Sequence, residues 1–525
     1  MKYNTRSGES GRTIINTLRA QSPLAYPNLK GYRVTIMGLG LHGGGLVSSL
    51  FFLNCGAEVT ITDLKGEEKL QESIKKLERE KPPNSTYKLI LGEHREIDFK
   101  NADLIIKNPG VPWSSRYLKI AREQGIPIET DISIFLRLKD NPIIAVTGSK
   151  GKSTTSAAIH CSLKSDFPGA KLGGNITVSP LAFIHQLHPR DPVVLELSSW
   201  QLADLRGKGV LKPKISLITN ILHDHQDKYN SMEEYIADKI VILENQDRWD
   251  FTILNLDDAY WRRFAEVANA QVLFSAEKPF SLYKIEHKQI GNTPVIEGAY
   301  LRNNEGYLEV VPRSPNTSNR KLILKVFDSI KLRGHHNRKN MLMASLAAYL
   351  FGIDIDKIKK SVSTFGGLEH RMELFYETSL VHGQKLLFYN DSAATIPEAT
   401  VNAILSLEEP TILITGGTDK NLDFSVFKSI IFKPEEIFLL EGSATDKIIT
   451  LLNLNGRKFR GPYNKLETLL YELKKFLLTA FNTSTTDISI VFSPGCASFE
   501  LFKNEFHRGE IFKQLVNKIF NPGAS

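Results

Sequence analysis

The sequence predicts an α/β protein with three domains, each built on a largely parallel sheet. Short runs of β-branched residues alternate with helix-like segments along almost the whole chain, and this is the pattern of parallel sheets covered by helices on both faces. The 525 residues exceed what one hydrophobic core usually serves, so about three domains are expected. We place an N-terminal extension at 1–30 and the domains at 31–140, 141–366 and 367–525.

The first block opens with a strand, a glycine-rich turn and a helix. Gly38, Gly40 and Gly43 follow the apolar run "VTIM", and Asp63 ends the next predicted strand. This spacing is typical of a Rossmann-like domain, in which a carboxylate at the place of Asp63 can bind a ribose hydroxyl. Taken alone, the turn favours an NAD-dependent dehydrogenase. A tight turn that binds no ligand is the structural alternative.

The second block begins with "IIAVTGSKGKSTT", where a strand gives way to small and polar residues. Gly148 and Gly151 allow backbone N–H groups to surround an anion at a helix N-terminus. The segment is a variant of the G-x-x-x-x-G-K-[ST] phosphate loop, with Ala145 at the first glycine position. It predicts a P-loop ATPase-like domain that binds a nucleoside triphosphate. Two independent loops imply two phosphorylated ligands.

The same block contains candidate ligands for magnesium. Glu196 ends the apolar strand "VVLE", and Ser153 or Thr154 can offer a hydroxyl from the phosphate loop. Such hard oxygen ligands suit Mg²⁺. His223 and His225 are joined by neither a cysteine nor a third histidine, so zinc is not favoured. A solvated glutamate at the sheet rim is the alternative for Glu196.

Later motifs add candidate binding groups. The amides of Asn337 and Asn340 could recognise an adenine edge, although helix capping by Asn337 is the simpler interpretation. Arg371 lies near the start of the third block, where a guanidinium can pair with phosphate oxygens, or be merely solvated. The runs "KLLFYNDS", "TILITGG" and "ISIVFSPG" each end in small or polar residues, where chemistry is expected in open α/β sheets. The polar stretch "RNNEGY" is predicted to be a loop.

Composition narrows the functional class. The 66 basic and 58 acidic side chains give a net charge of +8 without basic clusters, which favours anionic small molecules over nucleic acid. Cys55, Cys161 and Cys496 are far apart, which fits a reducing cytoplasm. The N-terminal segment lacks an apolar signal core, and the longest apolar stretch, "MLMASLAAYLFGI", is too short to cross a bilayer. We therefore expect a cytoplasmic protein without a membrane anchor.

Several of these motifs together resemble the Mur ligase family. The segments "TGSKGKST", "GGNI", "ELSSWQL", "DHQDKY", "YIADKIVIL", "GHHNRKN" and "LEHR" occur in the order found in that family, over residues 32–515. Its members are ATP-dependent enzymes of bacterial cell-wall precursor synthesis that join an amino acid to a UDP-linked muramoyl carboxylate. The segments "YNDSAAT", "GGTDKNLDF" and "FSPGCASFELFKNEFHRG" are similar to the branch that adds D-glutamate.

The resemblance implies binding sets for the two nucleotides. UDP-N-acetylmuramoyl-L-alanine would be bound by Gly40, Leu41, His42, Asp63, Leu64, Lys65, Asn108 and Gly110, with Asn175 and His225 near its muramoyl end. ATP would be bound by Gly148, Ser149, Lys150, Gly151, Lys152, Ser153, Thr154, Asn337, Asn340, Arg371 and Asp391. The sequence departs from the family at His42, where a small hydroxyl residue is common, and at Ala393, where a lysine is common.

It also implies the remaining sites and the chemistry. D-glutamate would be bound by Thr395, Lys420, Ser498 and Phe499, and the catalytic set would be Lys152, Glu196, His225 and Lys239. Two Mg²⁺ ions would be held by Ser153, Glu196, His225 and Lys239. The substrate carboxylate would attack ATP to give an acyl phosphate, which the amine of D-glutamate would then attack. Closure of the third domain over the second would gate turnover.

Lys239 has two contrasting interpretations. The segment "SMEEYIADKIVILENQ" predicts an amphipathic helix with Ile236, Ile240 and Leu243 on one side, and a lysine on such a helix is usually at the surface. The resemblance instead implies a lysine carbamate, whose negative charge would bind the second Mg²⁺ together with His225.

Three other functions remain open at this point. A Mur-type ligase could use a different amino acid, such as L-glutamate or L-alanine. An NAD-dependent oxidoreductase would explain the first glycine turn but not the second loop. A non-catalytic nucleotide-binding protein would explain the folds but not Lys152, Glu196 and Lys239 together. We expect a monomer that binds UDP-N-acetylmuramoyl-L-alanine, D-glutamate and ATP, and no nucleic acid.

Overall fold

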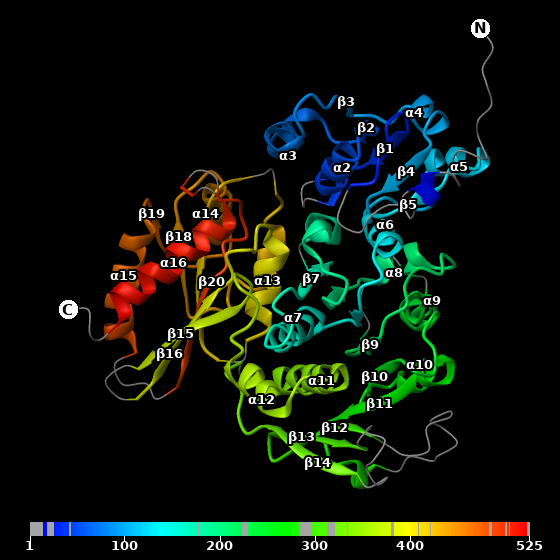
Figure 1. Ribbon diagram of the computed structural model, residues 1–525. Coiled ribbons are helices and arrows are strands. Elements are labelled where there is room, and N and C mark those ends of the chain that lie inside the picture. Colours follow the sequence, from blue (N-terminus) through cyan, green and yellow to red (C-terminus); the bar gives the residue numbers. More distant parts are fainter. Residues whose placement is uncertain are drawn as a thin grey trace, which may run out of the picture. The chain divides into compact units, whose positions relative to one another are not determined.

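The computed structural model divides the chain into two compact units, residues 1–365 and 366–525. Figure 1 draws unit 1 from blue to yellow-green and unit 2 from yellow to red. The structure describes residues 14–17, 26–40, 44–176, 178–222, 229, 231–283, 297–311, 321–332, 334–379, 383–407, 409–419, 422–481, 486–498, 501–502 and 504–521.

The first sheet of unit 1 has five parallel strands in the order β3-β2-β1-β4-β5. Both faces of β1 are buried, because Val34 and Ile36 join one core cluster and Met37 joins another. The strand order reverses between β1 and β4, which is where ligands bind in open α/β sheets. The elements are β1 (Arg33–Met37), α2 (Gly44–Asn54), β2 (Glu58–Asp63), α3 (Glu67–Glu80), β3 (Tyr87–Leu91), α4 (Glu96–Lys100), β4 (Leu104–Lys107), α5 (Arg116–Glu123), β5 (Ile128–Glu129) and α6 (Asp131–Leu138).

The second sheet of unit 1 has nine strands in the order β14-β13-β12-β11-β10-β9-β6-β8-β7. Strands β6 to β12 all run parallel to one another. Helices α7 and α11 pack against each other (Figure 1). The elements are β6 (Ile143–Thr147), α7 (Lys152–Leu163), β7 (Lys171–Gly174), η1 (Pro180–Gln186), β8 (Val193–Glu196), α8 (Ser199–Leu205), β9 (Ile215–Ile218), α9 (Met232–Ile240), η2 (Val241–Leu243), β10 (Phe251–Asn255), α10 (Trp261–Val267), β11 (Gln271–Ala276), η3 (Phe280–Leu282), β12 (Gly298–Arg302), β13 (Glu305–Val310), β14 (Leu322–Phe327), α11 (His335–Phe351) and α12 (Ile355–Thr364).

The edge of this sheet corrects one prediction. The stretch "RNNEGY" is mostly strand, because β12 and β13 form an antiparallel hairpin around Asn303 and Asn304. Both asparagines have positive φ, 54° and 66°, and asparagine tolerates this conformation in two-residue hairpin turns. The loop prediction was therefore wrong outside the two turn residues.

Unit 2 has one sheet in the order β15-β16-β20-β17-β18-β19, in which only the edge strand β15 is antiparallel. The elements are β15 (Glu373–Ser379), β16 (Lys385–Asn390), α13 (Pro397–Leu405), β17 (Thr411–Thr415), η5 (Ser425–Ser429), β18 (Glu436–Leu440), α14 (Thr445–Leu454), β19 (Arg460–Tyr463), α15 (Leu466–Ala480), β20 (Ile488–Phe492) and α16 (Glu505–Phe520).

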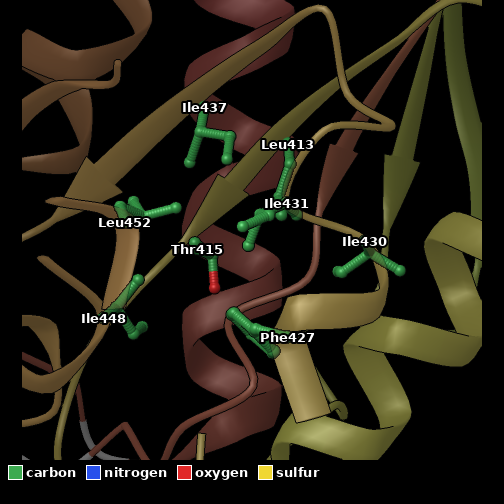
Figure 2. Close-up of a pocket in the computed structure, with 8 residues that line it drawn as sticks. All are labelled: Leu413, Thr415, Phe427, Ile430, Ile431, Ile437, Ile448 and Leu452. Atoms are coloured by element: carbon green, nitrogen blue, oxygen red, sulfur yellow. The ribbon is translucent and has the colours of Figure 1, made fainter. Parts of the chain in front are cut away.

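A small cavity of about 10 Å³ lies in the core of unit 2, between β17, β18, η5 and α14 (Figure 2). Its lining is apolar except for Thr415, whose Oγ1 donates to Pro494 O at 2.8 Å. A buried water needs at least two polar partners, so this cavity is a dry packing defect and not a ligand site.

The predicted α/β class, with three blocks that each carry a largely parallel sheet, is confirmed. The division into three domains at 140 and 366 stays a prediction. Across the described residues, none of the helices combines the length and the apolar character needed to cross a membrane.

Candidate active site

The loop between β6 and α7 has the backbone of a phosphate-binding loop. Gly148 and Gly151 have φ values of 140° and 81°, which L-residues with side chains rarely adopt. A Cβ atom at Gly148 would also clash with Thr219 Oγ1. The first backbone N–H groups of α7 have no acceptor within the helix, so this end of the helix suits an anion.

Residues after the neighbouring strand β9 hold this loop in place. The backbone N–H groups of Ser149 and Lys150 donate to Asn220, to its carbonyl O at 2.8 Å and to its Oδ1 at 2.9 Å. Thr219 Oγ1 donates to Lys150 O at 2.6 Å. Sequence reasoning missed Thr219 and Asn220, although they end the apolar run "ISLI" in the same way that the predicted site residues end their strands.

The predicted phosphate ligands lie in the loop and the first turn of α7. Lys152 is half-buried, and its Nζ donates to Ser149 O at 2.9 Å. Lys150 is exposed, and Ser153 and Thr154 are half-buried. The loop and the first turn of α7 therefore combine two lysines and the hydroxyls of Ser149, Ser153 and Thr154 with the helix N-terminus.

Glu196 is buried at the end of β8, beside Val146 of β6. Only 1% of its surface is exposed. Its Oε1 accepts a hydrogen bond from Asn175 Nδ2 at 3.0 Å, and its Oε2 has no partner among the residues that the structure describes. A buried carboxylate oxygen without a partner is costly, so Glu196 fits a metal ligand and not the solvated rim glutamate considered above.

Lys239 is buried as well, and it reaches the phosphate loop. It is 1% exposed, and its Nζ donates to Gly148 O at 3.0 Å and to Thr147 Oγ1 at 3.4 Å. The ammonium lies 4.5 Å from the centre of the Tyr235 ring, and the Tyr235 hydroxyl is 3.0 Å from Ser149 Oγ. The interpretation of Lys239 as a surface lysine is therefore wrong.

Asn340 of α11 lies against the other side of the loop. It is buried, and a Cβ atom at Gly151 would clash with its Oδ1. Its Nδ2 is 3.4 Å from Asn337 Oδ1. The capping interpretation of Asn337 is wrong, because α11 begins at His335 and its cap residue is Gly334. The structure brings Asn340 to the phosphate loop, and adenine recognition stays a prediction.

The glycine turn after β1 is closed by Asp63 and Asn108. The Asp63 carboxylate accepts hydrogen bonds from the backbone N–H groups of Gly40, at 3.1 Å, and of Lys65, at 2.9 Å. Asn108 Nδ2 donates to Gly38 O at 3.3 Å. Asp63 therefore already has two backbone partners and holds the shape of the turn.

The other residues predicted to bind the UDP-linked substrate are exposed or lie outside the described part of the chain. Leu64, Lys65, Gly110 and Asn175 are exposed. The predictions for Leu41, His42 and His225 fall outside the described residues, as does Gly43. A Cβ atom at Gly45, the second residue of α2, would clash with Gly38 O, so α2 packs closely against the turn.

In unit 2, Asp391 follows β16 and is buried. Its Oδ1 accepts from the backbone N–H of Met372 at 3.1 Å, and its Oδ2 from Ser493 Oγ at 2.6 Å. Burial raises the pKa of Asp391 to about 7, although these hydrogen bonds and the charges of Arg371 and Arg508 oppose the shift. The loop that carries half-buried Arg371 has positive φ values on both sides of it, 61° and 43°.

The candidate glutamate ligands lie at the carboxyl ends of the central strands of unit 2. Thr395 is half-buried after β16, and Ser498 is buried after β20. Within the described part of the chain, Ser498 Oγ has no hydrogen-bond partner, which fits a ligand group. Lys420 and Phe499 lie outside the described residues.

Sequence reasoning also missed Arg508 of α16. This fully buried guanidinium donates to Cys496 O at 3.0 Å, to Ala497 O at 2.9 Å and to Ser392 O at 2.7 Å. It therefore ties the loop after β16 to the loop after β20. Burial lowers the pKa of Arg508 to about 10. Its spacing from Phe512 and Val516 on the apolar side of α16 was the available signal for burial.

Comparisons with known proteins agree with this geometry. Residues 146–348 match the family model of the Mur ligase middle domain, and residues 32–130 match that of the Mur ligase MurD-like N-terminal domain. Proteins named UDP-N-acetylmuramoylalanine–D-glutamate ligase are similar to almost the whole chain. Those of Treponema pallidum and Borreliella burgdorferi are 37% and 38% identical, over 94% of this chain and 98% and 99% of their own lengths. The relative from Roseiflexus sp. is 37% identical over 93% of this chain and 99% of its own. The chain therefore belongs to the Mur ligase family.

Proposed function

We propose that this protein is an ATP-dependent ligase that joins D-glutamate to UDP-N-acetylmuramoyl-L-alanine in peptidoglycan precursor synthesis. The near full-length similarity to proteins of that name supports the substrates. The observation that supports the chemistry is the phosphate loop with two buried side chains beside it. One oxygen of Glu196 lacks a partner among the described residues, and Lys239 Nζ donates a hydrogen bond to Gly148 O.

The proposed reaction forms an acyl phosphate and then an amide. A carboxylate oxygen of the L-alanine residue attacks the γ-phosphorus, the bond to the bridging oxygen breaks, and ADP leaves. The amine of D-glutamate then attacks the acyl carbon, phosphate leaves, and the amine loses a proton. Lys150, Lys152 and the N-terminus of α7 would stabilise the negative charge of the triphosphate during the first step.

An ATP-dependent ligase of this family is expected to use Mg²⁺, and the donor set fits it. Glu196 Oε2 is a buried carboxylate oxygen, and Ser153 adds a hydroxyl at the phosphate loop; both are hard oxygen ligands. Bound Mg²⁺ would supply positive charge that offsets the charge on the phosphates. We propose Ser153, Glu196, His225 and Lys239 as the ligands of two ions.

Lys239 would act as a ligand in the form of a carbamate. Its uncharged Nζ would attack the carbon of CO₂, a C–N bond would form, and one proton would be released. The change replaces a cation with an anion, so its interaction with a metal ion changes from repulsion to attraction. The remaining N–H could still donate to Gly148 O. The burial of Lys239 beside the phosphate loop supports this role.

The first glycine turn would bind the UDP part of the substrate, and unit 2 would supply Thr395, Lys420, Ser498 and Phe499 for D-glutamate. Asn337, Asn340, Arg371 and Asp391 are proposed to complete the ATP site. We propose that the protein is cytoplasmic, because ATP and a UDP-linked precursor are cytoplasmic substrates, and that it is a monomer.

Phosphate release from ATP tests the proposal. The purified protein is mixed with UDP-N-acetylmuramoyl-L-alanine and one of a panel of D- and L-amino acids. We expect release that requires the muramoyl substrate and is fastest with D-glutamate. Release with L-glutamate or L-alanine instead would identify a ligase of different specificity, and absence of release with every amino acid would contradict ligase activity.

A further inference from the structure

Helix α8 connects Glu196, the proposed metal ligand, to the first sheet of unit 1. The helix begins three residues after Glu196, and its start is fixed by a capping box between Ser198 and Gln201. Such reciprocal capping removes freedom from the helix start. A displacement of α8 would therefore be passed on to Glu196.

A buried ion pair ties α8 to the first sheet. Lys107, the last residue of β4, donates from Nζ to both carboxylate oxygens of Asp204 at 2.9 and 2.8 Å. Both side chains are only 2% exposed, and Trp113 Nε1 donates to Asp204 Oδ1 at 2.6 Å. Burial raises the pKa of Asp204, and the charge of Lys107 opposes this shift. A buried pair of this kind has directional contacts that an apolar contact lacks.

Two further ion pairs extend the connection on both sides. After α8, Lys208 Nζ lies 3.0 Å from Glu129 Oε2 at the end of β5. Arg206 donates to Asp238 Oδ1 at 2.7 Å, and Asp238 precedes Lys239 on α9. Helices α8 and α9 also pack against each other (Figure 1). The segment 199–208 thus contacts the first sheet at two points and the helix that carries Lys239 at a third.

We infer that Lys107 and Asp204 are positioning residues, which hold the glycine turn of the first sheet at a fixed distance from Glu196 and Lys239. Lys107 directly precedes Asn108, which donates to Gly38 O in that turn. This inference rests on the proposed function, in which one substrate is bound at its UDP end by the turn and reacts at its acyl end beside Glu196. A fixed spacing would place the acyl carboxylate against the γ-phosphate, and an error of about 1 Å can slow such a step about 100-fold.

The kinetic test uses Asp204→Asn, Lys107→Met and the apolar pair Lys107→Met with Asp204→Leu. We expect kcat to fall about 100-fold in all three, with Kd values for ATP and for UDP within twofold of the unmodified protein, because each nucleotide contacts one side of the connection. The apolar pair separates positioning from stability, since replacing a buried ion pair by apolar residues often preserves stability.

Asp103→Asn is the matched control. It breaks the ion pair between Arg33 and Asp103, in which Asp103 Oδ1 lies 3.0 Å from the guanidinium. Both residues of this pair belong to the segment that forms the first sheet. We expect its kcat to be unchanged. A folded apolar-pair variant with the kcat of the unmodified protein would overturn the inference.

A distance measurement tests the same inference without activity. Spin labels are placed on the exposed thiol of Cys161 in α7 and, through Lys119→Cys, on α5. We expect one narrow distance distribution in the unmodified background and a broader one with Asp204→Asn. An equally narrow distribution in both would overturn the inference. If the unmodified protein releases no phosphate, the proposed function fails while this measurement still decides the positioning role.

Discussion

The phosphate loop of unit 1 and the strand-end loops of unit 2 both accept hydrogen bonds from a buried lysine or arginine, but they differ in the buried groups that lack a partner. Lys239 donates to Gly148 O in unit 1, and Arg508 donates to three carbonyl groups in unit 2. Within the described residues, the buried groups without a partner include a carboxylate oxygen of Glu196 in unit 1 and the hydroxyls of Ser392 and Ser498 in the loops of unit 2.

This difference indicates what each site binds. A buried carboxylate oxygen requires a cation or a proton donor, whereas a hydroxyl can donate a hydrogen bond to an anionic group. Unit 1 is thus suited to a metal ion with a triphosphate, and unit 2 to a ligand with hydrogen-bonding groups such as an amino acid. In both sites, N–H groups of a buried side chain, Lys239 in unit 1 and Arg508 in unit 2, donate to the backbone of the loops.

The largest effect is expected at Lys239. If it acts as an anion, Lys239→Ala and Lys239→Arg should each lower phosphate release on the order of 1000-fold, because neither can form the carbamate. Short carboxylic acids should partly restore the alanine variant by occupying the vacated space. Glu233→Ala, at an exposed position of α9, is the control. Full activity of Lys239→Arg would refute the carbamate and show that unit 1 uses a cation there.

The next effect concerns metal affinity. Glu196→Gln removes the buried charge and should weaken Mn²⁺ binding, followed by electron paramagnetic resonance, on the order of 100-fold. Asn175→Ala removes the hydrogen bond to Oε1 and should cost about tenfold, as supporting contacts to metal ligands do. A larger loss for Asn175→Ala than for Glu196→Gln would mean that the carboxylate is not the ligand.

Replacing the proposed D-glutamate ligands of unit 2 should raise the KM for D-glutamate by different amounts. Lys420→Ala should raise the KM for D-glutamate about 10- to 100-fold, the cost of a charge-assisted contact of about 1.5 to 3 kcal/mol. Ser498→Ala should raise it about three- to tenfold. The KM for ATP should hardly change in either variant. Equal increases in the KM for D-glutamate and in the KM for ATP would contradict the assignment of amino-acid binding to unit 2.

The last prediction concerns the pH dependence of stability in unit 2, which does not involve a ligand. The raised pKa of Asp391 means that the folded state keeps a proton that the unfolded state has lost. Its stabilising contribution is therefore complete below about pH 4 and is lost as the pH rises through about 7, at up to about 1.4 kcal/mol per pH unit. Hydrogen exchange of β16 and β20 amides in the full chain measures this slope. Asp391→Asn should lack it, and an identical slope in both proteins would contradict the assignment.

The order of strands and turns could be predicted from the sequence, since strand, glycine and helix follow one another locally. The pairing of distant segments could not. Nothing near residue 149 indicates that Asn220 accepts from the backbone of the phosphate loop, because that contact depends on β6 and β9 being neighbours. Lys239 shows an intermediate case. It lies three residues from Ile236 and thus on the apolar side of its helix, which indicates burial. Lysine is usually exposed, however, so the sequence favoured a surface position.

The position of Arg508 in the chain has a consequence for biosynthesis. The arginine is on α16, which follows every strand of unit 2 in the sequence, whereas its acceptors follow β16 and β20. Because a chain leaves the ribosome from its N-terminus and domains tend to fold as they emerge, unit 1 can form its phosphate loop while unit 2 is still being translated. The loops of unit 2 acquire their shared anchor only when α16 has emerged. During synthesis, the protein should therefore be able to bind nucleotide before it can bind its amino acid.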